Sequence, residues 1–76
     1  MKIQIKNNDN SNLLEFKTEE EFQSFKLKMT EILKDTTNTK VVVFERDEET
    51  LVFPALYLKS SRISISKKDK QEILFL

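Results

Sequence analysis

The 76-residue chain contains no cysteine, no histidine and no glycine. Without cysteine or histidine it can form neither a disulfide nor a zinc site of the usual sulfur and nitrogen ligands. The same absence excludes catalysis by a Ser–His or Cys–His pair, because neither the base nor the thiol exists. Glycine-rich phosphate-binding loops of the Walker and Rossmann types are excluded because they require glycine at fixed positions.

Long apolar segments are also missing. The longest uncharged apolar stretch, residues 50–58, is far shorter than the ~20 residues that a membrane-spanning helix requires. The first ten residues show no apolar core of a signal peptide. We therefore expect a cytoplasmic protein that does not act at a membrane.

Charge of either sign is balanced over the whole chain but not along it. Thirteen basic and thirteen acidic residues give a net charge of zero, so no global field draws the chain to nucleic acid. Residues 18–58 carry five basic and nine acidic groups, net −4, and residues 59–76 carry five basic and two acidic groups, net +3.

The periodicities that are present predict strands on both sides of one helix. Residues 2–6 alternate polar and apolar side chains, and residues 13–17 are expected to form the partner strand of a hairpin. The connecting residues 7–12 are rich in asparagine, which tolerates the left-handed backbone that glycine would otherwise supply. Residues 18–21 form a capping box that opens the helix. Its predicted apolar stripe consists of Phe22, Phe25, Met29, Ile32 and Leu33.

Further strands are predicted after the helix, at residues 40–45, 50–53, 62–66 and 71–76. Pro54 is expected to bend the second of these or to end it. The whole chain, residues 1–76, is then a single α+β domain, a small antiparallel β-sheet with one α-helix packed on one face. The predicted order is β-β-α-β-β-β-β, with one strand fewer if Pro54 ends that element.

The strands after the helix do not alternate, since residues 41–44 are all apolar. One helix can cover only one face of a sheet, so a second apolar face remains to be buried. That face is covered either by the chain's own segment 54–61 in a curled sheet or by another chain. The second alternative assigns an interface to Val42, Phe44, Val52, Leu74 and Leu76. Each such side chain contributes ~1.5–3 kcal/mol when fully buried.

A chain this small is marginally stable alone, so we expect a homodimer, a protein partner, or both. Under this hypothesis Phe44→Glu disrupts association and leaves the helix core intact. The loop carboxylates Glu48 and Glu49 are expected to form an exposed acidic rim. Residues 45–49 of this loop and the glutamates at 19–21 form one negative patch if both regions lie at the same end, and that patch fits a basic, nucleic-acid-binding groove of another protein.

An alternative function is weak binding of nucleic acid through the basic segment 59–70. Its cations could follow a phosphate backbone; they are Lys59, Arg62, Lys67, Lys68 and Lys70. The simpler interpretation is that lysine protects an exposed strand edge from aggregation. The sequence predicts no catalytic residues, no metal site and no cofactor.

Short, glycine-poor α+β chains that are rich in lysine, asparagine and isoleucine and lack catalytic residues resemble in type the accessory proteins of phages and mobile elements from low-GC bacteria. The resemblance is one of composition over the whole chain, without a diagnostic motif. It implies a small non-enzymatic protein-binding domain that inhibits a host protein by binding it.

Overall fold

The computed structural model describes residues 1–67 and 70–74, with side chains over residues 1–67. The α+β class predicted from the sequence is confirmed, but the strands form two sheets and a second, short helix follows Pro54. In chain order the elements are β1 (Lys2–Asn7), β2 (Asn10–Glu15), α1 (Glu19–Lys34), β3 (Val41–Glu45), β4 (Thr50–Pro54), α2 (Ala55–Lys59), β5 (Arg62–Lys67) and β6 (Lys70–Leu74).

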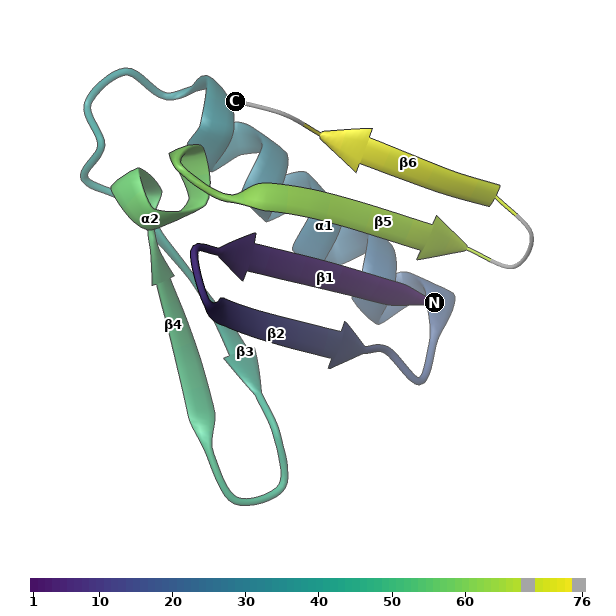
Figure 1. Cartoon of the computed structure of the whole chain (residues 1–76). Helices are drawn as coiled ribbons and strands as arrows, with labels where there is room; N and C mark the ends of the chain where they lie inside the picture. Colours follow the sequence, from purple (N-terminus) through teal and green to yellow (C-terminus); the bar gives the residue numbers. More distant parts are fainter. Residues whose placement is uncertain (68–69, 75–76) are drawn as a thin grey trace.

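The larger sheet has the antiparallel order β2-β1-β5-β6, and α1 lies across one of its faces (Figure 1). Alternate residues of β1, β2 and β5 point toward the helix and are buried, as the alternating sequence predicts. They are Ile3, Ile5, Leu14, Ile63 and Ile65. This sheet therefore matches the expectation of one covered face.

The β1–β2 turn is tighter than predicted. Asn7 pairs with Asn10, so β2 begins three residues before Leu13, and Asn8 adopts a left-handed φ of 55°. A two-residue loop needs such a conformation, and asparagine supplies it where the chain has no glycine. Asn38 does the same in the connection between α1 and β3, with φ 58°.

Helix α1 begins and ends as the sequence indicates. The Thr18 hydroxyl accepts a hydrogen bond from the Glu21 backbone N–H at 3.1 Å, which satisfies one of the unpaired donors of the first turn. At the other end Asp35 lies just beyond the helix. The Thr37 backbone N–H and then the Thr37 hydroxyl stabilise its carboxylate and lower the pKa of Asp35.

Strands β3 and β4 form a hairpin that is a separate two-stranded sheet, and Figure 1 shows it projecting at an angle to the larger sheet. Val42 pairs with Phe53, and both are buried against the helices. Val43 pairs with Val52 on the opposite face of the hairpin. The apolar run 41–44 thus has one inward and one outward set. Helix α1 contacts β3 and also lies across the larger sheet (Figure 1).

Pro54 ends β4. The Arg46 N–H donates to the Glu49 carbonyl at 2.8 Å, and alternation from this pair makes Val41 and Pro54 a non-hydrogen-bonded pair. The N–H that proline lacks would face away from β3, so the ladder loses nothing. Ala55 and Leu58 of α2 then join the core, so of the two alternatives open from the sequence the structure has the one in which Pro54 ends the strand.

Candidate protein-binding groove

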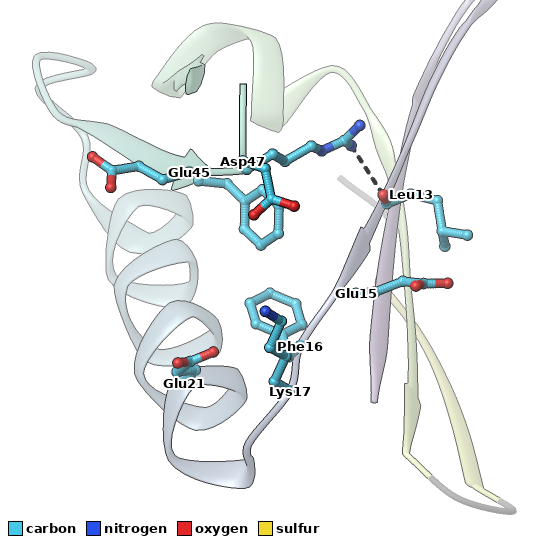
Figure 2. Close-up of a pocket in the computed structure, with 9 residues that line it drawn as sticks. Leu13, Glu15, Phe16, Lys17, Glu21, Glu45 and Asp47 are labelled. Carbon is cyan, nitrogen blue, oxygen red and sulfur yellow. Dashed lines mark hydrogen bonds between the residues drawn. The ribbon is translucent and has the colours of Figure 1, made fainter. Parts of the chain in front are cut away.

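An open groove with a volume of about 690 Å³ lies between β2 and the β3–β4 hairpin (Figure 2). One side is formed by residues from the end of β2 and the turn after it, which are Leu13, Glu15, Phe16 and Lys17. Residues 44–47, from the end of β3 and the hairpin loop, form the other side, and Glu21 of α1 lies at the base. The groove therefore exists only because the hairpin docks beside an edge strand of the larger sheet.

Two half-buried aromatic rings form the floor of the groove. The Phe16 and Phe44 ring centroids lie 5.3 Å apart in an edge-to-face arrangement. Phe25 of α1 contacts both rings, at 5.5 Å from Phe16 and 5.9 Å from Phe44. Such pairs contribute ~0.5–1.5 kcal/mol beyond the area they bury, so this aromatic cluster fixes the hairpin to the rest of the fold.

The Arg46 side chain spans the groove. Its Nη2 donates to the Leu13 carbonyl oxygen at 3.0 Å, and its Nη1 lies 3.2 Å from a Glu49 carboxylate oxygen. The guanidinium carbon lies 5.8 Å from the Phe44 ring centroid, within the range of a cation–π contact. The groove thus already accommodates a guanidinium group through an aromatic ring, a backbone carbonyl and a carboxylate.

Carboxylates outnumber cations around the floor, because Glu15, Glu21, Glu45 and Asp47 line the groove with Lys17 and Arg46. Figure 2 shows the Asp47 carboxylate extending toward Phe16, whereas Glu15 and Glu45 point to the two outer sides. Within the described residues, no three of the acidic side chains are close enough together to hold a metal ion. The negative charge is therefore distributed along the groove.

The hairpin has a second surface, which we call the outer hairpin face and define by Val41, Val43 and Val52. Their side chains are 51%, 45% and 54% exposed. Val43 and Val52 are directly opposite each other in the β3–β4 register. Three β-branched side chains side by side on a strand pair make a small uncovered apolar patch.

The residues assigned to an interface from sequence do not share a face. Val42 is 3% exposed and belongs to the core, and Phe44 is half-buried in the aromatic cluster, whereas Val52 lies on the outer hairpin face. The assignment placed Val42 and Val52 together, but the register pairs Val52 with Val43, which corrects the grouping. Leu74 ends β6 opposite Ile63, with its side chain outside the described part, and Leu76 lies outside the described residues.

The acidic residues are partly where the sequence placed them. Glu48 and Glu49 are exposed in the hairpin loop, and Glu49 pairs with Arg46. The groove itself is lined by their neighbours Glu45 and Asp47. The start of α1 and the hairpin do lie at one end, since Glu21 lines the same groove.

The basic segment proposed for nucleic acid is spread over several elements. Lys59 of α2 donates to the Asp35 carbonyl and to Asn38, and Lys67 pairs with Glu19. Arg62 and Lys67 are at opposite ends of β5, about 17 Å apart at the rise of a strand. Lys70 begins β6, with its side chain outside the described part, and Lys68 lies outside the described residues.

Sequence reasoning did not identify Phe16, Lys17 or Arg46 as site residues. Phe16 is half-buried, and its exposed part lines the groove. No local signal could have joined it to Phe44, because the contact depends on how the hairpin docks.

No known protein family, no curated protein and no solved structure matches this chain in the comparisons with known proteins. Among the helices of the described residues, none is both long enough and apolar enough to cross a membrane.

Proposed function

We propose that the chain is a non-enzymatic protein-binding domain whose groove takes a positively charged segment of a partner protein. The observation that carries the proposal is the half-buried Phe16–Phe44 floor with four carboxylates and two cations around it. A lysine or arginine side chain suits such a site, because its methylene stem packs on the rings while its charged end approaches Asp47, whose carboxylate extends toward Phe16 (Figure 2).

The exposure of the carboxylates limits what each can contribute. An exposed ion pair is worth ~0.2–1 kcal/mol, so a single basic side chain would bind weakly. A segment with several basic residues gains more, because the carboxylates are distributed along the groove. The same argument supports an inhibitory role, in which the acidic groove engages the basic, nucleic-acid-binding surface of a host protein.

Titration with two end-blocked peptides tests the proposal. One peptide alternates arginine with threonine, and the other alternates glutamate with threonine. We expect the arginine peptide to bind, with an affinity that falls as salt rises, and the glutamate peptide not to bind. Equal affinities for both peptides, or no binding of the arginine peptide at low salt, would contradict the proposal. Salt-dependent binding of a DNA oligonucleotide instead would favour the basic segment 59–70.

We also propose that a second copy of the chain covers the outer hairpin face. Val43 and Val52 form an apolar pair that can meet itself across a two-fold axis, and the zero net charge leaves no overall repulsion between copies. Val52→Glu is therefore expected to give a monomer at concentrations where the unmodified chain is a dimer, as measured by sedimentation. Leu27→Glu is the matched control, since Leu27 is equally apolar and exposed but lies on α1. A monomeric unmodified chain at every concentration would rule out this dimer.

A further inference from the structure

We infer that the partner segment binds as an extended strand, added antiparallel to the free edge of β2, and that Arg46 occupies its place in the free protein. The inference rests on the proposed function, since it specifies how the groove holds a basic segment. Strand addition of this kind obtains affinity from backbone hydrogen bonds and specificity from alternate side chains.

The outer edge of β2 has no strand beside it within the part of the chain that the structure describes. In the order β2-β1-β5-β6 it is a terminal strand, and the neighbouring hairpin forms its own sheet. An edge strand presents a row of backbone donors and acceptors that another chain can pair with. Here Leu13 and Glu15, in the second half of that edge, line the groove (Figure 2).

The hydrogen bonds define which backbone groups are presented. Because the Leu13 carbonyl accepts from Arg46 at 3.0 Å, it points away from β1. Because backbone groups alternate in direction along an antiparallel strand, the N–H and C=O groups of Ser11 and Glu15 also point away from β1. The Phe16 N–H donates to the Met1 carbonyl at 3.0 Å. The backbone N–H of Phe16 therefore points toward the first strand, as this alternation requires.

Arg46 acts as an internal substitute for the added strand. Its guanidinium donates to the Leu13 carbonyl and lies over the Phe44 ring. One side chain thus occupies both the position of a partner's backbone N–H and the position of a partner's cation. A partner strand would give the Leu13 carbonyl a backbone N–H and would bring its own arginine or lysine to the ring. Because both cannot bind there at once, Arg46 competes with the partner.

The register predicts which partner residues face which way. Residues opposite Ser11, Leu13 and Glu15 donate their N–H groups to β2, and their side chains lie on the same face as that of Leu13. The intervening residues turn their N–H groups away from β2, and their side chains point to the Phe16 side. The basic residues of the partner therefore belong at these intervening positions, above the aromatic floor.

Two N-methylated forms of the arginine–threonine peptide test this arrangement on the unmodified protein. Methylation of the backbone nitrogens of the threonine residues removes the N–H groups that pair with β2, and we expect it to weaken binding about tenfold or more. Methylation of the backbone nitrogens of the arginine residues removes N–H groups that face away from β2, and most of the affinity should remain. Hydrogen exchange at the Leu13 and Glu15 amides should slow when the unmethylated peptide binds.

The role of Arg46 has its own test, in which Arg46→Ala is expected to raise the affinity for the arginine–threonine peptide severalfold. Lys28→Ala is the control, since it removes one positive charge outside this groove. Unchanged or weaker binding in Arg46→Ala would overturn the competition. Equal affinities of the two methylated peptides, or the reverse order, would overturn strand addition while peptide binding itself stands. Failure of the unmethylated peptide to bind would instead remove the proposed function.

Discussion

Replacement of Phe44 by alanine is expected to destabilise the protein by about 2–4 kcal/mol and to release the β3–β4 hairpin from the rest of the fold. The Phe44 ring contacts Phe16 at 5.3 Å and Phe25 at 5.9 Å. Its removal leaves a gap where the hairpin, α1 and β2 meet. A chain of this size has a total stability of about 4–11 kcal/mol, so the loss is a large part of the whole.

Chemical unfolding measures the loss, and hydrogen exchange locates it. We expect the amides of β3 and β4 to lose protection before those of β1 and β5. Val43→Ala is the control, because it removes an exposed side chain from the same strand and should change stability by no more than about 0.5 kcal/mol. Equal losses in the two variants would contradict the aromatic cluster as the docking contact.

The same contacts change what Phe44→Glu is expected to do. From the sequence alone, Phe44 is expected to belong to an interface that can be altered without harm to the helix core. In the structure the ring lies against Phe25 of α1, so a glutamate there places a charge among aromatic side chains. Destabilisation is now the expected result, and Val52 is the residue with which to test self-association.

Reversal of two groove charges, Glu21→Lys together with Asp47→Lys, is expected to weaken binding of the arginine–threonine peptide about tenfold or more. The lining changes from four carboxylates and two cations, net −2, to two carboxylates and four cations, net +2. The reversed groove should instead bind the glutamate–threonine peptide. Isothermal titration of both peptides against both proteins measures the exchange of preference.

A matched control is available one residue away from each changed position. The variant with Glu20→Lys and Glu48→Lys carries the same net charge, but neither residue lines this groove. We expect it to keep most of the affinity for the arginine peptide. An equal loss in the control would mean that the net charge of the chain, rather than the groove, attracts the peptide.

The parts of the fold that were predicted correctly depend on local sequence. The Thr18 cap and the buried stripe of α1 involve residues three and four positions apart, and the left-handed Asn8 lies within a two-residue turn. In each case the physical cause lies in a few neighbouring residues. The local sequence is therefore enough to predict these features without knowledge of the tertiary contacts.

The groove could not be predicted because its contacts are distant in sequence. Leu13 and Arg46 are 33 positions apart, and the run of four apolar residues at 41–44 gives no parity that distinguishes the inner from the outer face. Docking against Phe16 and Phe25 selects Val42 and Phe44 as the inner set. Only the acidic patch was predicted in part. Its prediction depended on the start of α1 and the hairpin loop lying at the same end of the molecule, and in the structure they do.

Mapping of amide chemical shifts would show whether a basic segment binds in the space between β2 and the hairpin. Isotope-labelled protein would be titrated with the arginine–threonine peptide. We expect the largest shift changes to gather at residues 13–17 and 44–47 and to saturate together. Changes centred on residues 59–67, or scattered evenly over the chain, would contradict it.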